Sequence, residues 1–404
     1  MGKPHVLVSG AGIAGPTVAF WLYRAGFTVT VVERSTKLRA SGQNIDIRGH
    51  GLTIIERMDL QDEVRAKKTN EKGLRFVDAQ DRGRAEFPVG DGKGFTGEIE
   101  IMRGDLAIIL YEATKKDVEY VFGDYVKGYK ESGHGLEVEF THGHPTRKFD
   151  LLIAADGWSS KTRRIAFPDI NDSCVKPLGQ WGAWFSLPRQ PSDSGWARWY
   201  NAPKSRMLLV RPDNENVTRA SMWIMHDDRR FKQAQQETER EQKALLNDLF
   251  GDAGWETDRL LKGMQDADDF YIQQIAQIKL ETWSRGRVVL VGDAAYCPTP
   301  ISGMGTTVAL AGAYVLAGEI VHHWPDYTAG FEAYEKKMGP FVAKAQKLAP
   351  GAPGLANPQT QRGISILYFL LAVVAWIRLH KIMGASFSPP ATAMDLPDYG
   401  TFRR

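Results

Sequence analysis

The first thirty residues alternate between short apolar runs and glycine-rich turns. Residues 5–9 (HVLVS) form a run that is typical of a buried strand. The following apolar residues recur at the spacing of one helix face, at Val18, Ala19, Leu22 and Ala25. Gly26 is placed to end that helix, and a second apolar run follows at 28–32. The pattern predicts a strand–helix–strand unit.

The turn between the first strand and the helix carries the chemistry of this unit. Its sequence over 10–15, GAGIAG, has the GxGxxG spacing. Glycines at these positions allow a tight turn, let a pyrophosphate approach the helix N-terminus, and let the helix pack closely on the strand. Glu33 ends the second strand, where a carboxylate can accept hydrogen bonds from a ribose. The unit predicts a dinucleotide-binding site.

Two later strands also end in an acid beside a glycine. The run at 151–155 leads into Asp156 and Gly157, and the run at 288–291 leads into Gly292 and Asp293. Asp293 is placed to hold a chain of sugar-like hydroxyls. A glycine-flanked turn, 303–305, then opens a helix of small residues, whose N-terminal N–H groups can face a ring carbonyl.

Residues 172–280 contain no dinucleotide motif and are rich in aromatic runs separated by turns, which predicts an antiparallel sheet. Trp181 and Trp184 are three residues apart, so strict alternation fails there and we expect a bulge or a loop. The charged stretch 227–249 predicts one surface helix. The aromatic side chains of the sheet could roof a pocket for a planar ligand or simply form core; these are Trp181, Trp184, Trp199, Tyr200 and Trp223.

The last apolar stretch, 363–377, is shorter than the roughly 20 residues that span a bilayer. We favour a buried helix that packs across the domains. Arg378, His380 and Lys381 follow it, so a segment that lies on a membrane surface stays open as the alternative.

Composition excludes several classes of function. The 404 residues carry a formal net charge of +3, which is too small to favour a nucleic-acid partner. Cys174 and Cys297 form no CxxC pair and the histidines form no metal pattern, so no metal site is expected. The scarcity of cysteine fits a reducing compartment, and we expect a cytoplasmic protein.

Three motifs in order carry a family resemblance: GAGIAG with Glu33, the DGxxSxxR stretch at 156–163, and the GDAA…P…GxG stretch at 292–305. Together they resemble the single-component FAD-dependent aromatic hydroxylases of the para-hydroxybenzoate hydroxylase fold. The segment RASGQNID at 39–46 is most similar to that of the tetracycline-inactivating monooxygenases. The chain departs from the family pattern at Tyr296, where His is usual, at Thr307, where Asn is common, and at Gly312, where an acid is common.

The resemblance implies an α/β fold. A Rossmann-like FAD-binding domain, a parallel sheet with helices, is interleaved with an antiparallel-sheet substrate domain and followed by a C-terminal helix. The expected boundaries are 1–171 and 281–350 for the two parts of the FAD-binding domain, the first including part of the substrate sheet. Residues 172–280 form the substrate domain, and 351–404 hold a helix that bridges the domains.

The resemblance also implies site residues. FAD would contact Gly10, Gly12, Ile13, Ala14, Gly15, Glu33, Arg34, Asp46, Arg103, Asp293, Gly303, Met304 and Gly305. Arg39 would touch NADPH or the mobile flavin, and Asp156 would support the flavin and face NADPH. A solvated surface charge is the alternative for Arg34, Arg39 and Arg48. Candidates for substrate contact are Gln43, Trp184, Arg198, Tyr200, Trp223 and Pro300. No catalytic residue is assigned.

The implied activity is monooxygenation in secondary metabolism. NAD(P)H, with NADPH favoured, would reduce FAD, and a flavin hydroperoxide would deliver one oxygen atom of O₂ to an aromatic or polyketide-like small molecule. A second GxGxxG is absent from the sequence, so the nicotinamide would bind transiently in a groove. The alternatives are a flavin epoxidase or Baeyer–Villiger enzyme of the same fold, a halogenase, and a non-catalytic flavin-fold binding protein.

Overall fold

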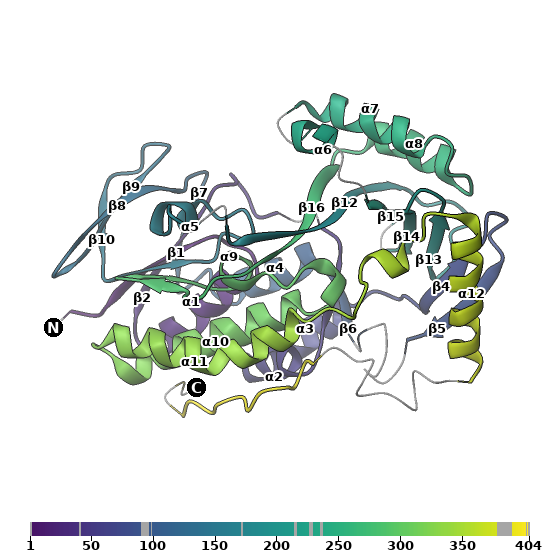
Figure 1. The fold of residues 1–404 in the computed structure, drawn as a ribbon. Coiled ribbons are helices and arrows are strands. Elements are labelled where there is room, and N and C mark those ends of the chain that lie inside the picture. The colour runs from purple at the N-terminus through teal and green to yellow at the C-terminus, as the bar shows by residue number, and fades with distance from the viewer. Residues whose placement is uncertain are drawn as a thin grey trace.

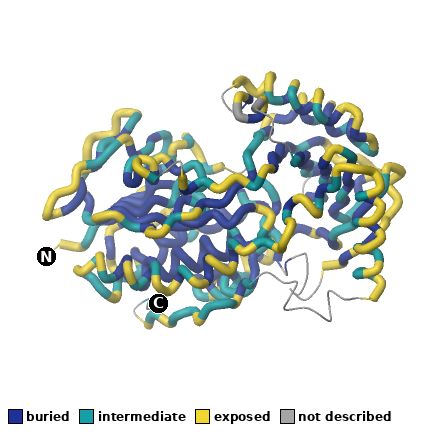
Figure 2. The backbone as a smooth tube through the Cα atoms, viewed as in Figure 1, coloured by how far each residue is buried: buried dark blue, intermediate teal, exposed yellow. Residues whose placement is uncertain are grey.

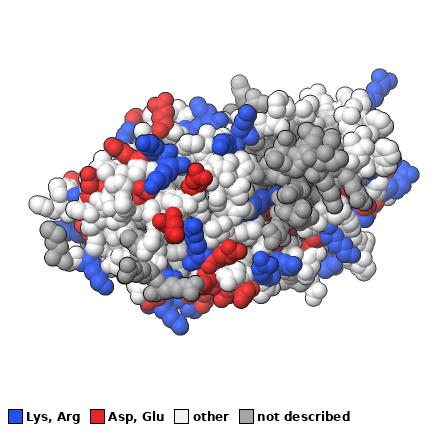
Figure 3. Space-filling model, turned by 90° about the horizontal axis from the view of Figure 1, so that it is seen from below, with Lys and Arg blue, Asp and Glu red and all other residues white. Residues whose placement is uncertain are grey.

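A computed structural model describes residues 2–39, 42–89, 97, 99–170, 173–213, 216–225, 229–234, 237–377, 390–400 and 402. Within these ranges the chain has an α/β architecture in which two large sheets lie side by side with helices packed on them (Figure 1). Basic and acidic side chains are interspersed on the face seen from below (Figure 3), in keeping with the small net charge.

The first sheet contains the predicted strand–helix–strand unit and the two later buried strands. Its order is β17-β18-β11-β1-β2-β7, with β17 antiparallel at one edge and the other strands parallel. The bounds are β1 His5–Ser9, β2 Thr28–Glu33, β7 Glu119–Phe122, β11 Leu151–Ala154, β17 Ser284–Arg285 and β18 Val288–Leu290. Because β1 lies between β2 and β11, the carboxyl ends of all three acid-bearing strands meet at one edge.

Helices and smaller sheets complete this half. Helix α10 (Gly305–His323) is buried along most of its length and packs against α1 (Ala14–Arg24), α2 (His50–Arg57) and α11 (Tyr327–Ala345). Its mostly apolar sequence therefore marks a central core helix. The remaining elements are α3 Gln61–Ala66, α4 Arg103–Glu112, α5 Lys161–Ala166, α9 Asp293–Tyr296, the pair β3 Asn44–Ile47 and β6 Ile99–Met102, and the sheet of β8 Val126–Ser132, β9 Gly135–Phe140 and β10 Arg147–Phe149.

The second sheet is mostly antiparallel and has the order β16-β12-β15-β14-β13-β4-β5. Only the β13–β4 pair is parallel. The bounds are β4 Gly73–Val77, β5 Gly83–Pro88, β12 Val175–Pro188, β13 Ala197–Ala202, β14 Arg206–Pro212, β15 Val217–Met225 and β16 Tyr271–Ile278. Strands β4 and β5 reach it from the first part of the chain, so the two halves are interleaved.

The structure corrects the expectation of a bulge or a loop between Trp181 and Trp184. Both lie in the continuous strand β12, and its irregularity falls earlier, between Pro177 and Gln180. Trp181 stacks on Phe231 under the helices, with ring centroids 5.1 Å apart, whereas Trp184 points to the opposite face. Residues at odd spacing face opposite sides of a strand, so the two tryptophans serve two different cores.

The single helix expected over 227–249 is two helices, α6 (Arg229–Ala234) and α7 (Glu239–Phe250); residues 226–228 and 235–236 lie outside the described ranges. Thr238 starts α7 with a capping box, since its backbone N–H donates to the Glu241 carboxylate at 2.8 Å. This Thr-x-x-Glu signal was present in the sequence. With α8 (Thr257–Asp266), these helices cover one face of the second sheet (Figure 1).

Two of the departures from the family pattern compensate for each other. A Cβ atom on Gly312 of α10 would lie 1.8 Å from the hydroxyl oxygen of Tyr296, so the missing side chain makes room for the tyrosine. The Tyr296 hydroxyl lies 2.9 Å from that of Tyr334. Thr307, the third departure, donates to the backbone carbonyl of Arg48 at 3.1 Å.

The C-terminal helix differs from expectation. Helix α12 (Gln361–Trp376) packs on β5 and β13 of the second sheet, and among its side chains only Ile364 and Tyr368 are fully buried. Its outer side is exposed (Figure 2). Residues 390–400 and 402 lie instead against the first half, where the Phe402 and Trp21 ring centroids are 4.9 Å apart. The basic residues at 378, 380 and 381 lie outside the described ranges. In the part of the chain that the structure describes, no helix combines the length and apolarity needed to cross a bilayer.

Candidate functional site

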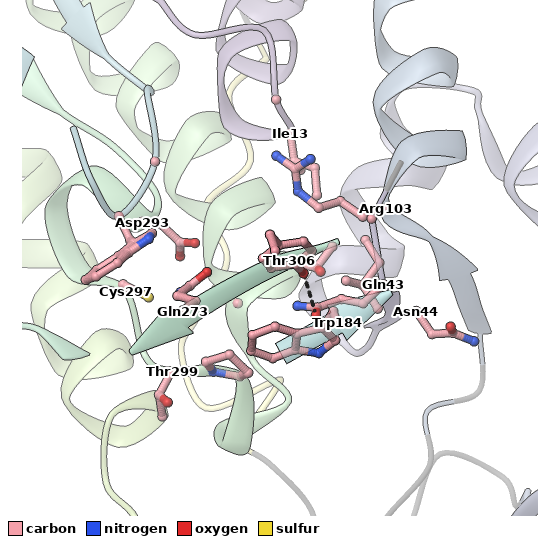
Figure 4. A pocket seen from close by; sticks show the side chains of 18 of the residues that line it. Ile13, Gln43, Asn44, Arg103, Trp184, Gln273, Asp293, Cys297, Thr299 and Thr306 are labelled. Atoms are coloured by element: carbon pink, nitrogen blue, oxygen red, sulfur yellow. Dashed lines mark hydrogen bonds between the residues drawn. The ribbon is translucent and has the colours of Figure 1, made fainter. Parts of the chain in front are cut away.

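One large cavity, about 870 Å³ in volume, joins the two halves. It runs from the β1–α1 turn, past the carboxyl ends of β2, β11 and β18, to the second sheet. Side chains from many elements point into it, including Arg103 of α4, Trp184 of β12, Gln273 of β16 and Asp293 of α9 (Figure 4).

The glycine turn has the geometry that its sequence predicted. Gly10 has φ +108°, and a Cβ there would lie 2.6 Å from the carbonyl oxygen of Ala155. A Cβ on Gly15 would lie 1.9 Å from the carbonyl oxygen of Gly10, so this glycine lets α1 pack on the turn. No side chain caps the N-terminus of α1. The cavity wall here is formed by Gly10, Gly12, Ile13 and Ala14, and Gly15 lies behind it.

Three arginines gather at this end of the cavity: Arg34, Arg39 and Arg103. Partial burial, and then the positive charges of Arg34 and Arg103, lower the pKa of the Arg39 guanidinium. The nearest acid, Glu33, accepts hydrogen bonds from the backbone N–H groups of Ala11 at 2.9 Å and Ser35 at 3.0 Å. The mutual repulsion of the arginines would be relieved by a bound anion such as a pyrophosphate.

Asp156 also lines the cavity and holds the start of α5. Its carboxylate accepts from the Ser160 hydroxyl at 2.5 Å and from the Thr162 N–H at 3.0 Å. Arg163, at the end of the same motif, donates to the carbonyl oxygen of Ala294 at 2.9 Å. The DGxxSxxR and GDAA stretches are thus tied together, because one supplies a buried guanidinium and the other a carbonyl oxygen in α9.

Asp293 follows the carboxyl end of β18 and lies beside Cys297. Burial raises the pKa of the Asp293 carboxyl, although the charge of Arg103 opposes this. Gly303, Gly305 and Pro300 line the cavity near it, whereas Met304 is completely buried behind the wall. No side chain caps the N-terminus of α10, so its N–H groups are free to bind a ligand oxygen.

Asp46 is on the cavity wall but already engaged: it accepts from Arg48 at 2.9 Å and from the N–H of Gly97 at 3.0 Å. Arg48 is buried, which corrects its alternative assignment as a surface charge. Arg34 and Arg39 remain exposed at the mouth of the cavity.

An aromatic wall closes the cavity on the side of the second sheet. The Trp184 ring stacks on Tyr271 with centroids 5.1 Å apart and meets Trp223 edge-on at 4.9 Å. The Tyr271 hydroxyl donates to the side-chain carbonyl of Gln43 at 2.9 Å. Three candidate substrate residues, Trp184, Trp223 and Gln43, therefore lie together in the wall.

Two substrate candidates lie elsewhere, which corrects their assignment. Arg198 and Tyr200 point to the opposite, helix-covered face of the second sheet. Arg198 is buried and pairs with Asp193 at 2.9 Å and Glu256 at 2.5 Å, and the Tyr200 hydroxyl donates to the Ala253 carbonyl at 2.9 Å. The sequence-based assignment failed because the face that each residue presents depends on strand register.

The structure adds a polar cluster that no motif marked. Arg211 forms a bidentate pair with Glu71, both bonds 3.0 Å, and the Glu100 carboxyl also contacts its guanidinium. Burial raises the pKa of Glu100 to about 8 despite the opposing charge of Arg211, since two carboxylates share one guanidinium. Glu71 and Arg211 are 140 residues apart, so only the folded chain brings them to the cavity.

Several buried polar atoms of the cavity wall have no partner among the described residues: both side-chain polar atoms of Asn44, Oε1 of Gln180, Oγ1 of Thr299 and Oδ1 of Asn357. Thr299 also has φ +82°, which is unfavourable for a β-branched residue. Buried polar groups are ordinarily hydrogen-bonded, so these atoms indicate a site made for a ligand.

Residues 3–349 match the model of a protein family described as the FAD binding domain. The chain belongs to this family, the FAD-dependent monooxygenases of the para-hydroxybenzoate hydroxylase type. It is 35% identical over 425 residues to the FAD-dependent monooxygenase asL4 of Sarocladium schorii, covering 99% of each chain. It is 37% identical to the flavin-dependent monooxygenase eupH of Phoma sp, covering 98% of this chain and 97% of that protein.

The same resemblance holds in three dimensions. The crystal structure of the tetracycline destructase Tet(51) superposes with a TM-score of 0.79 at 32% identity, over 98% of this chain and 99% of that one. The family assignment from the three motifs is confirmed. The chain is a flavoprotein oxidoreductase, and FAD is its cofactor. The expectation of an enzyme is confirmed, against the alternative of a non-catalytic binding protein.

Proposed function

We propose that the enzyme uses NADPH to reduce bound FAD and inserts one oxygen atom into a planar aromatic or polyketide-like molecule. Overall, the substrate, O₂, NADPH and one proton would give the oxygenated substrate, water and NADP⁺. The observation that supports this most directly is the continuity of one cavity from the arginine-lined glycine turn to the aromatic wall.

The residues present fit FAD. The uncapped α1 N-terminus, with Arg34 and Arg103, would bind the pyrophosphate, and Glu33 would accept from the ribose. Asp293 would hold the hydroxyl chain, and the N-terminus of α10 would donate to a ring carbonyl. Bound FAD would supply the redox and oxygen chemistry, whereas the protein orients the reactants and excludes water.

The second sheet would hold the substrate. Trp184 and Trp223 offer apolar aromatic surface for a planar ring system. Because the Tyr271 hydroxyl fixes the Gln43 side-chain carbonyl, the amide group of Gln43 is oriented to donate to a substrate oxygen. The unpaired polar atoms of Gln180 and Thr299 would bind further oxygens of the substrate or cofactor.

NADPH would dock at the mouth of the cavity. Arg39 is exposed there, and its positive charge suits a ribose phosphate. Asp156 also lines the cavity, next to Gly10 of the glycine turn. Anaerobic stopped-flow reduction with NADPH and NADH in parallel tests the choice of nucleotide, and we expect Arg39→Ala to slow reduction by NADPH more than reduction by NADH.

The proposal that the aromatic wall binds a planar substrate is tested with a matched pair of variants on one strand. Trp184→Ala removes an aromatic ring from the cavity face of β12, and Trp181→Ala removes one from its helix-covered face. We expect Trp184→Ala to raise KM in substrate-stimulated NADPH oxidation, with phenols and tetracycline as probes, and Trp181→Ala to lower stability with KM unchanged. Equal effects on KM would refute the assignment of the wall.

Epoxidation or Baeyer–Villiger oxygenation would use the same cavity and remains the second candidate. All three reactions add one oxygen atom, so product mass does not separate them. NMR of the product distinguishes a phenol from an epoxide or an expanded ring.

A further inference from the structure

Helix α12 presents an apolar face to solvent. Large apolar side chains follow one another on its outer side with exposed fractions of 61% for Ile366, 68% for Phe369, 55% for Leu370 and 84% for Trp376. Val373 and the helix C-cap, Ile377, extend this outer face. Five of the ten large exposed apolar side chains of the described residues belong to this helix, and a sixth is its C-cap, Ile377.

The helix has two apolar sides with different environments. Its inner side packs on Phe76 and Phe87, and the Tyr368 hydroxyl donates to the carbonyl of Val77 at 2.9 Å and accepts from the N–H of Asn201 at 2.9 Å. These contacts hold the helix firmly on the second sheet. The outer side is therefore not left exposed by loose packing, and contiguous apolar patches of this kind mark an interaction surface.

The charge of the surrounding sequence indicates which partner this face would meet. The chain holds 48 acidic residues in 404, or roughly one in eight, yet none falls between Glu335 and Asp395. The same stretch contains seven Lys or Arg residues. Three of them belong to α11, where Lys337 pairs with Glu319, whereas Arg362 lies in the first turn of α12 and Arg378 and Lys381 follow the helix in sequence. An apolar helix face with Phe, Leu and Trp inside a stretch of purely basic charge complements an anionic lipid surface.

We propose that the outer face of α12, formed by Ile366, Phe369, Leu370, Val373 and Trp376, docks the enzyme onto an anionic bilayer. The helix would lie in the interface with its apolar side among the acyl chains. The preceding residues 352–357 include part of the cavity wall, so docking would bring that wall next to the membrane.

The test is flotation of the full-length holoenzyme with vesicles of phosphatidylcholine alone and of phosphatidylcholine mixed with phosphatidylglycerol. We expect binding to the anionic vesicles that weakens with added salt. The double variant Phe369→Ser/Trp376→Ser should lower the partition coefficient by at least about tenfold, because two large apolar side chains are lost from the interface.

The matched control is Tyr23→Ser, which removes an exposed aromatic ring, 41% exposed, from α1. It should leave the partition coefficient unchanged. Flavin absorbance verifies that both proteins are folded. Equal binding of the double variant and the wild type would overturn the proposal, as would equal binding to neutral and anionic vesicles. A wild-type dimer that the double variant converts to a monomer would assign this face to a second copy of the chain and also overturn it.

Discussion

The contact between Gly312 and Tyr296 allows a sharp test of how the chain accommodates its departures from the family pattern. Gly312 is buried in the middle of α10, and the Tyr296 hydroxyl occupies the space of its missing Cβ at 1.8 Å. Once the hydroxyl is removed, the nearest tyrosine atom is Cζ, at 3.1 Å from that Cβ position. The two residues should therefore be strongly coupled in stability.

The expected energies follow from two opposing effects. Gly312→Ala gains roughly 0.5–1 kcal/mol in helix propensity, but forcing a methyl group into an occupied site costs about 1–3 kcal/mol. The overlap is severe, so we expect a net loss of about 2 kcal/mol. Tyr296→Phe should cost about 1 kcal/mol, because one buried hydrogen bond is lost while Tyr334 keeps the Leu290 carbonyl at 3.2 Å.

The double variant Gly312→Ala/Tyr296→Phe shows whether the tyrosine hydroxyl causes the loss of stability, or whether α10 tolerates no added side chain at this position. With the hydroxyl gone, the added methyl group fits after a shift of a few tenths of an ångström, so the double variant should be about as stable as Tyr296→Phe alone. Urea unfolding followed by circular dichroism gives the four free energies of unfolding. If the loss of stability in the double variant equals the sum of the two single losses to within about 0.5 kcal/mol, the proposed compensation is refuted.

Three further predictions concern charged residues. Arg103→Ala should weaken FAD binding by at least about tenfold, measured by titrating the apoprotein, and unchanged affinity would contradict its place at the pyrophosphate. Glu100 has a pKa of about 8 in the folded state against an ordinary 4.5. In the window between these two pH values it keeps its proton in the folded state and loses it on unfolding. The free energy of unfolding should therefore fall as the pH rises through the window, by up to about 1.4 kcal/mol per pH unit, and Glu100→Gln should remove this slope in urea titrations. Arg198→Met should lower stability by about 1.5–3 kcal/mol, because the Asp193 and Glu256 carboxylates lose one of their two arginines and keep Arg259, without changing the KM of the folded enzyme. A raised KM would return Arg198 to the substrate site.

Much of the cofactor site could be predicted from the sequence, because its parts are local. Gly10 and Gly15 are separated by one turn, and their role follows from backbone sterics alone. Asp156 and Asp293 end buried strands, and parallel strands bring their carboxyl ends to one edge. The substrate side could not be predicted in the same way. Arg198 and Tyr200 carry suitable side chains, but the register of β13 turns them away from the cavity.

The sequence by itself determined the family, the nucleotide-binding unit and the order of the motifs, since these depend on residues close together in the chain. Only the tertiary structure decided which tryptophans line the cavity, that Glu71, Glu100 and Arg211 meet there, and that one side of α12 stays exposed. The physical reason is that an apolar run shows that side chains avoid water, but not against what they pack. That partner is set by strand register and by contacts between segments far apart in sequence.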